Sequence, residues 1–462
     1  MKITKTVLSN FVCILTLLAT SVSNISIAQT VSNDTFFDGK TFKGWKKVGG
    51  AAPYEIKNGE IIGTMTKGTP NSFLITEKQY GDFILELEVK LDGDATNSGI
   101  QIRSHIDSTS HKDRKVVYGK QVEIDPSDRS WTGGIYDESR RLWLYPVDLN
   151  ESAKKAFKRN EYNKIRIEAI GNETKTWVND IPVAHVIDTI DQKGHIALQV
   201  HSIPANLDGL KVYFKNLNLQ TSNLKSRPLP NDMYTVNLGL NTLSSIEKQN
   251  GYKLLFNGKD ANSWRSVKGP QFPSKGWTIK NGEIGVQKSN GGESTNGGDI
   301  ITKDQYGAFD LSFEFKMTEA ANSGVKYFVT LKEETNGSAI GLEYQILDDK
   351  NHPDAKMGIQ GNRTLASLYD LKTANKTNRS LRPIGQWNKG RIVVTPNNQV
   401  TYFLNGEKVL TFTRGSQEFK DLVAISKYKN WENFGMAPQG YILLQDHGDE
   451  VYFRNIKIKE LK

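Results

Sequence analysis

The stretch Gly341–Asp349 reads GLEYQILDD, and its polar and apolar residues alternate. A period of two is typical of a β-strand that packs one face on a core and leaves the other face open. Glu343 and Gln345 share the open face, with side chains roughly 7 Å apart. A carboxylate beside a carboxamide can grip a polyhydroxylated ligand or move a proton, although a solvent-facing strand without chemistry would show the same pattern.

The same pattern occurs earlier in the chain, where Gly119–Asp125 reads GKQVEID. Other matches between the two halves keep the same order, which indicates an internal duplication. They include Phe37–Lys40 with Phe256–Lys259, Ile56–Ile61 with Ile279–Ile284, Asn97–Gly99 with Asn322–Gly324, Tyr136–Asp137 with Tyr369–Asp370, and Val212–Asn216 with Val451–Asn455. Many short β-prone runs separated by Gly and Asn turns predict an all-β protein built from two tandem jelly-roll β-sandwiches.

The first residues, Met1–Ala28, have the form of a signal peptide. Lys2 and Lys5 precede an apolar run, and Ser26–Ala28 offers a small-x-small cleavage site. The apolar run is too short to span a bilayer, so we expect a periplasmic or secreted protein with no transmembrane segment in the mature chain. Cys13 is the only cysteine, so we expect core burial, without internal disulfides, to stabilise the mature protein.

The length of 462 residues suits two or three domains. We predict a signal peptide at 1–28, a first sandwich at 29–220, a linker at 221–249 and a second sandwich at 250–462. The linker contains Pro228 and Pro230. Its Ser244–Glu247 stretch has the form of a helix capping box, which predicts a short helix before the second sandwich.

The net charge is +9, but the basic residues are scattered among acidic ones. A nucleic-acid-binding protein would show a basic stripe and a recognisable motif, and the sequence has neither. We therefore expect no nucleic-acid partner. The oligomeric state is not predicted by any feature of the sequence.

The second half closely resembles the 3-keto-disaccharide hydrolase domain family. The stretches that carry the resemblance are Leu254–Lys259, Asn322–Phe328, Gly341–Asp349, His352–Lys356, Gly361–Asp370, Leu443–Asp449 and Phe453–Asn455. The first half is similar but looser, because it lacks the His-Pro-Asp segment and has Val200 where the second half has Asp446. The resemblance implies concanavalin-like sandwiches and an oligosaccharide or glycoside substrate oxidised at C3. It also implies export, because members of the family are usually exported.

Polar residues of the second half gather at strand ends and in loops. We take Glu343, His447, Lys326 and His352 as candidate catalytic residues, and Gln345, Asp354, Lys356, Arg363, Tyr369 and Asp446 as candidate substrate-binding residues. A structural role is the alternative for His447, and turn formation is the alternative for His352 and Asp446. No calcium-binding loop of fixed spacing is present, so the metal is unknown and a divalent cation is the cofactor left open.

The first half keeps a second set of polar residues. Gln101, Arg103 and His105 are expected on one strand face, and Gln121 and Glu123 on another. Trp131 could stack on a sugar or belong to the core. Arg103, Gln121, Glu123 and Trp131 are therefore further candidate substrate-binding residues, in either an altered active site or a binding module.

The mechanism follows from the substrate chemistry that the resemblance implies. A ketone at C3 acidifies the hydrogen on C2, so a base, either Glu343 or His447, can remove it. A lysine, histidine or cation then stabilises the enolate, and the oxygen on C1 leaves. A retaining glycosidase would need two carboxylates about 5–5.5 Å apart, whereas this strand face carries only one. A lectin-like sugar-binding protein and a conventional glucanase are the two rival functions.

Overall fold

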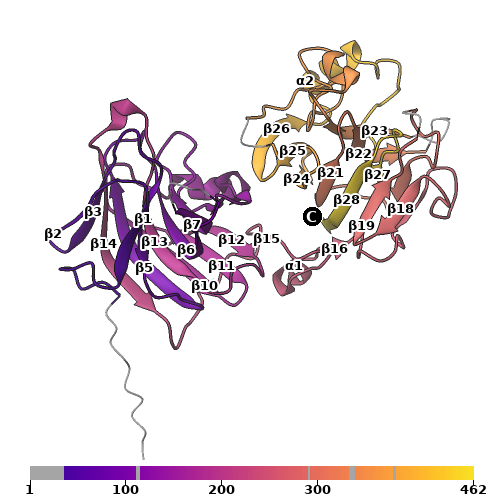
Figure 1. The fold of residues 1–462 in the computed structure, drawn as a ribbon. Coiled ribbons are helices and arrows are strands. Elements are labelled where there is room, and N and C mark those ends of the chain that lie inside the picture. The colour runs from indigo at the N-terminus through magenta and orange to yellow at the C-terminus, as the bar shows by residue number, and fades with distance from the viewer. Residues whose placement is uncertain (1–35, 111–114, 290–291, 332–338, 378–380) are drawn as a thin grey trace, which may run out of the picture. The chain divides into compact units, whose positions relative to one another are not determined.

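The computed structural model describes residues 36–110, 115–289, 292–331, 339–377 and 381–462 (Figure 1). The predicted signal peptide at 1–28 lies outside these residues. Strands dominate the described chain, as the alternating sequence predicts. No helix within the described residues is long and apolar enough to cross a bilayer.

The first sandwich packs a seven-stranded sheet against an eight-stranded one. The first sheet has the order β1-β4-β13-β6-β7-β8-β9 and the second has the order β15-β12-β11-β10-β5-β14-β3-β2. The first sheet comprises β1 (Trp45–Gly49), β4 (Ser72–Thr76), β6 (Ser98–Asp107), β7 (Val116–Ile124), β8 (Ile135–Glu138), β9 (Leu142–Tyr145) and β13 (His195–Val200). The second comprises β2 (Tyr54–Lys57), β3 (Glu60–Thr64), β5 (Phe83–Leu91), β10 (Asn163–Ile170), β11 (Glu173–Val178), β12 (Ile181–Ile187), β14 (Lys211–Gln220) and β15 (Val236–Asn237). Two 3-10 helices, η1 (Val147–Lys155) and η2 (Ala205–Leu207), lie in its connections.

The second sandwich repeats this plan. Its five-stranded sheet has the order β17-β20-β27-β22-β23, and its eight-stranded sheet has the path β18-β19-β28-β21-β24-β25-β26 with β16 beside β28. The first comprises β17 (Trp264–Ser266), β20 (Ile300–Thr302), β22 (Asn322–Thr330), β23 (Ile340–Leu347) and β27 (Tyr441–Leu444). The second comprises β16 (Lys253–Leu254), β18 (Trp277–Lys280), β19 (Glu283–Val286), β21 (Phe309–Met317), β24 (Asn388–Val394), β25 (Gln399–Leu404), β26 (Glu407–Thr413) and β28 (Val451–Glu460). The 3-10 helix η3 (Pro353–Lys356) and the helix α2 (Gln417–Ile425) lie in its connections.

Apolar residues that alternate along the strands fill the space between the sheets. Phe83, Leu85, Leu87 and Val89 of β5 are buried in the first core, and Phe309, Leu311, Phe313 and Phe315 of β21 in the second. The strand orders of the two sandwiches correspond, so β6 and β7 stand where β22 and β23 stand. The prediction of an all-β protein with two sandwiches is confirmed.

The predicted linker contains two short elements. Helix α1 (Ser245–Gln249) begins at the predicted capping box, in which Ser244 and Glu247 each bond the other's backbone N–H. Glu247 also pairs with buried Lys457 of β28 at 2.5 Å. The sequence did not reveal β15, which pairs in parallel with β12. The exact domain limits stay a prediction.

Strand β6 contains an irregularity that corrects one sequence expectation. Its pairing with β7 shifts between Gln101 and His105, and Arg103 has a positive φ of 45°. Alternation therefore breaks at Arg103, which is 1% exposed. Its guanidinium donates to the carbonyl oxygens of Gly81, Ala169 and Gly171 and to the carboxylate of Asp82. Arg103 is thus a structural residue, not a sugar-binding one.

Candidate functional site

The neighbouring strands β22 and β23 carry the central polar side chains of the second sandwich. In their antiparallel register, Lys326 lies opposite Glu343 and Gly324 opposite Gln345. A Cβ on Gly324 would lie 2.1 Å from Glu343 Oε1. Only glycine therefore leaves room for the carboxylate to lie over β22.

These side chains form the floor of a cavity of about 240 Å³. The predicted residues Lys326, Glu343, Gln345, Tyr369 and His447 all line it. Residues without a predicted role also line it, namely Glu293, Asn322, Lys427, Tyr428, Trp431 and Gln445. A base candidate, two lysines and aromatic walls therefore share one concave site, which is typical of small-molecule sites.

Lys326 is held between carboxylates on the cavity floor. Its Nζ lies 3.6 Å from Glu293, 3.8 Å from Asp299 and 3.3 Å from the carbonyl oxygen of Ala339. Burial acts to lower the pKa of Lys326, but the surrounding carboxylates outweigh it and raise the pKa. Burial raises the pKa of Asp299 to about 7, against the attraction of Lys326. Lys326 therefore stays a cation in a carboxylate-rich floor.

Glu343 is only 4% exposed. Burial raises the pKa of Glu343, and the positive charges of Lys326 and Lys427 oppose this effect. Burial also lowers the pKa of Lys427, against the attraction of Glu343. A carboxylate whose pKa is raised in this way is a better proton acceptor than an ordinary glutamate.

No sequence pattern predicted a role for Lys427, Tyr428 and Trp431. They follow α2, about 85 residues beyond Glu343 in the chain. Lys427 Nζ lies 4.2 Å from the ring centre of Tyr369. The sequence of this segment carries no motif, so only the folded structure shows that it lies beside Glu343 and Gln345 of β23.

Of the predicted rim residues, Tyr369 lines the cavity, whereas Asp354, Arg363 and Lys356 do not. Arg363 bonds Asp354 at 2.9 Å and Asp370 at 2.6 Å, and the hydroxyl of Tyr369 donates to Asp354 at 2.8 Å. Asp354 and Arg363 therefore position Tyr369 and are outside the residues that line the cavity. Lys356 is exposed at the end of η3 and does not line it either. The expectation that these three side chains bind substrate directly is not supported by their positions.

Asp446 also needs a correction. It is fully buried, and its carboxylate accepts hydrogen bonds from the backbone N–H groups of Gly297, Gly298 and Gly448. These bonds use the carboxylate to hold two loops together. Asp446 therefore supports the site instead of reaching a substrate, which is the turn chemistry that the sequence left as the alternative.

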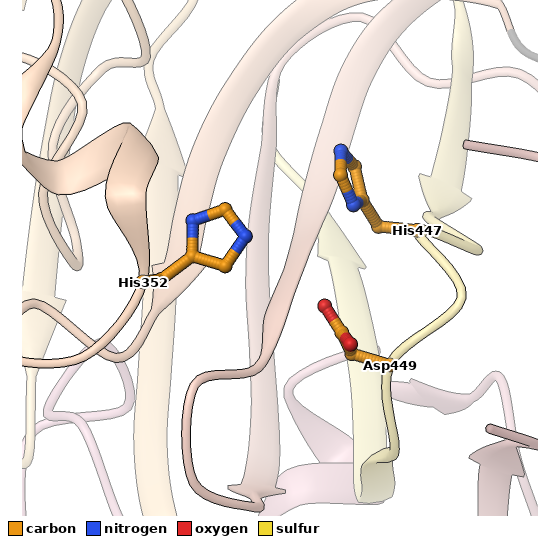
Figure 2. A group of neighbouring side chains, drawn as sticks. All are labelled: His352, His447 and Asp449. Atoms are coloured by element: carbon orange, nitrogen blue, oxygen red, sulfur yellow. The ribbon is translucent and has the colours of Figure 1, made fainter. Parts of the chain in front are cut away.

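His352, His447 and Asp449 converge on one space beside the cavity (Figure 2). Each offers a ligand atom within 4.8 Å of the others. Two imidazoles and a carboxylate suit a first-row transition metal. However, His352 Nδ1 accepts a hydrogen bond from the backbone N–H of Asp354 at 3.2 Å. Neutral His352 then carries its proton on Nε2, the nitrogen that faces the group, so a cation would have to displace that proton.

The first sandwich has a cavity at the corresponding place, with a volume of about 640 Å³. Gln121 and Glu123 line it, as the sequence predicts. Trp131 does not, because it is 3% exposed and its indole N–H donates to Asp148 at 3.0 Å. Its ring packs edge-on against Trp143, with centroids 4.7 Å apart. Trp131 is thus a core residue, whereas Trp143 lines the cavity.

Buried side-chain atoms without hydrogen-bond partners concentrate at the two cavity floors. Of seven such atoms among the described residues, all but Ser289 Oγ lie at or beneath these floors. They are Asn97 Oδ1, Gln101 Oε1, Gln199 Nε2, Asp299 Oδ2, Gln445 Oε1 and His447 Nδ1. Asn97, Gln445 and His447 line the cavities, so water or a polar ligand there can satisfy their atoms.

The chain was compared with known proteins. It is 38% identical over 232 residues to the 3-keto-disaccharide hydrolase of Bacteroides thetaiotaomicron, a match that covers 46% of this chain and 79% of that protein. A solved structure of a candidate glycosyl hydrolase from Parabacteroides distasonis is 32% identical, with a TM-score of 0.43, over 48% of this chain and 100% of the other. A carbohydrate-binding module from Bacillus subtilis is 19% identical, with a TM-score of 0.27, over 38% of this chain and 95% of the other.

The model of one domain family matches the chain twice, over residues 33–220 and 251–459. The two matched segments correspond to the two sandwiches and together span most of the chain. The resemblance found in the sequence is thereby confirmed. The chain belongs to the 3-keto-alpha-glucoside-1,2-lyase-like domain family and carries two copies of its domain.

Proposed function

We propose that the second sandwich cleaves glycosides or disaccharides that carry a ketone at C3. The observation that carries this proposal is the buried carboxylate of Glu343, which faces two lysines in one small cavity. Removing a proton next to a ketone requires this combination of a base and nearby positive charge. The family membership and the 3-keto-disaccharide hydrolase relative support the same substrate class.

In the proposed reaction, the Glu343 carboxylate takes the proton from C2, and the C–H electrons form an enolate with the C3 ketone. Lys326 and Lys427 stabilise the negative oxygen. The enolate then collapses to a C1–C2 double bond, and the C1–O bond breaks. His447 protonates the leaving oxygen. Addition of water, with a hydroxyl to C1 and a proton to C2, gives net hydrolysis.

The cavity offers less support for a conventional glucanase. The residue that shares the strand face with Glu343 is the amide Gln345. Glu293 is a second carboxylate at the cavity, and burial acts to raise its pKa. However, Lys326 and a hydrogen bond from Gln445 outweigh this effect and lower the pKa of Glu293. A glycosidase needs one carboxyl group with a raised pKa and one with a lowered pKa, so in a glucanase Glu343 would have to be the acid and Glu293 the charged partner.

The test is to incubate the purified protein with a 3-keto-glucoside and with the matching unoxidised glucoside. Cleavage of the 3-keto-glucoside alone is the expected result. Cleavage of the unoxidised glucoside would overturn the proposal in favour of a glucanase. Binding without cleavage of either compound would overturn it in favour of a lectin.

We also propose that the protein acts after export, since Met1–Ala28 has the form of a signal peptide. N-terminal sequencing of protein from the native cell should find a mature chain that begins near Gln29. A native chain that retains Met1 would contradict this proposal.

The variant Lys326→Gln should shift the pH dependence of the reaction. Lys326 lowers the pKa of Glu343, so its loss should raise that pKa further. The base acts only when deprotonated, so the acidic limb of the kcat/KM profile should move to higher pH. Activity should therefore fall most below neutral pH.

The control for this prediction is Lys316→Gln, which removes a lysine that pairs with Glu283 on the other sheet. Its profile should match that of the unmodified protein. If Lys326→Gln leaves the acidic limb in place, Lys326 does not act on the base.

A further inference from the structure

The first sandwich keeps the site architecture of the second but changes its chemistry position by position. In the β6–β7 register, Gln101 lies opposite Gln121 and Gly99 opposite Glu123. The corresponding pairs in the second sandwich are Lys326 with Glu343 and Gly324 with Gln345. The first sandwich therefore has two amides in place of the lysine and the base, and its carboxylate stands where the second has an amide.

The glycine of this arrangement is present in both copies. A Cβ on Gly99 would lie 2.2 Å from Gln121 Cδ, as one on Gly324 would lie 2.1 Å from the Glu343 carboxylate. The floor is thus shaped in the same way in both sandwiches. On these two strands, the difference between the copies lies in the polar groups.

A chain of hydrogen bonds fixes the groups of the first floor. Gln101 Nε2 donates to Gln121 Oε1 at 3.0 Å, and Gln121 Nε2 donates to Glu123 at 3.0 Å. Asn97 Nδ2 donates to the other oxygen of Glu123 at 2.7 Å. Gln199 lies beneath this floor, where its Oε1 accepts a hydrogen bond from Gln121 Nε2 at 3.4 Å. Asn97, which lines the cavity, has an Oδ1 without a partner, and this acceptor can meet a ligand hydroxyl.

Charges that would stabilise an enolate are largely missing from this cavity. Arg129 is the only lysine or arginine among the described residues that line it. Its guanidinium pairs with Asp125 at 2.5 Å and lies over the Trp131 ring, 4.4 Å from the ring centre. Arg129 is therefore engaged with its own sandwich and not directed at the position of a C3 oxygen.

The cavity is nevertheless well suited to an intact sugar. Its volume of about 640 Å³ exceeds the 240 Å³ of the second cavity and falls in the range of small-molecule sites. Tyr136 and Trp143 line it, with ring centroids 5.2 Å apart. Aromatic walls with a row of amide and carboxylate groups match a pyranose ring, which has apolar faces and an edge of hydroxyl groups.

We propose that the cavity of the first sandwich is a second carbohydrate site, which binds glycosides with an intact C3 hydroxyl and does not cleave them. The carboxylate of Glu123 and Oδ1 of Asn97, which both line the cavity, accept hydrogen bonds from sugar hydroxyls. This site is separate from the proposed active site and does not depend on its chemistry.

The test uses calorimetric titration of the full-length protein with methyl glucoside, cellobiose and maltose. The unmodified protein should bind at least one of them. Burial raises the pKa of Glu123 to about 7, so the titration is run at pH 8, where Glu123→Gln removes a charged acceptor and should weaken that binding about tenfold or more. Trp143→Phe retains an aromatic ring and should weaken it less, and thermal unfolding verifies that both variants are folded.

The matched control is Glu343→Gln, which alters the other sandwich and should bind these sugars as the unmodified protein does. Turnover of a 3-keto-glucoside should be retained in Glu123→Gln. The proposal is overturned if none of the three sugars binds, if Glu343→Gln and not Glu123→Gln abolishes binding, or if Glu123→Gln abolishes turnover. If the unmodified protein cleaves no 3-keto-glucoside, the proposed function is overturned. The proposal of a sugar-binding site in the first sandwich would still stand or fall by the titrations alone.

Discussion

The variant Glu343→Gln is expected to lose ~10²–10⁴-fold in kcat on a 3-keto-glucoside, because it removes the proposed proton acceptor. Gln has nearly the shape of Glu, so the cavity and the KM should change little. The position above Gly324 stays filled, which separates loss of chemistry from loss of packing. Steady-state kinetics across a range of pH measure the effect.

The control for this experiment is Glu123→Gln, the same substitution on the corresponding strand of the first sandwich. It should retain nearly full activity. If Glu123→Gln is inactive while Glu343→Gln is active, the chemistry belongs to the first sandwich. If both remain active, the strand signature is structural in both copies.

The variant Arg103→Met is expected to destabilise the first sandwich by about 2–4 kcal/mol. The substitution leaves the carbonyl oxygens of Gly81, Ala169 and Gly171 without their guanidinium donor, and unsatisfied buried groups are costly. Urea unfolding measured on the whole chain should show an earlier first transition.

A second variant, Arg103→Lys, keeps the charge but loses the planar fork, so it should recover only part of the stability. Sugar binding by the folded fraction should be unchanged in both variants. Unchanged stability with weakened sugar binding would instead restore Arg103 as a substrate-binding residue.

The sequence predicted those features that depend on local periodicity. Alternation places Glu343 and Gln345 on one face wherever the strand lies in the fold, and both line the cavity. The repeat predicted the second sandwich, because two segments with the same motifs in the same order are expected to share one fold. These inferences need no knowledge of long-range contacts.

The features that the sequence did not predict depend on irregular backbone or distant segments. A bulge in β6 turned Arg103 away from the expected face. Asp446 lies just after β27, between buried Gln445 and half-buried His447, where a carboxylate can serve the backbone or a ligand equally well. Lys427 enters the cavity from a segment whose own sequence contains no pattern that points to a site.

Gly324 has a consequence for how this protein tolerates mutation. Even alanine there would place a methyl carbon 2.1 Å from Glu343 Oε1 and push the carboxylate off the strand. A residue with no side chain thereby controls where the proposed base stands. A genetic screen for inactive but folded protein should recover substitutions at position 324 as readily as at position 343. Substitutions at position 324 would inactivate the protein by displacing Glu343, although glycine itself has no reactive group.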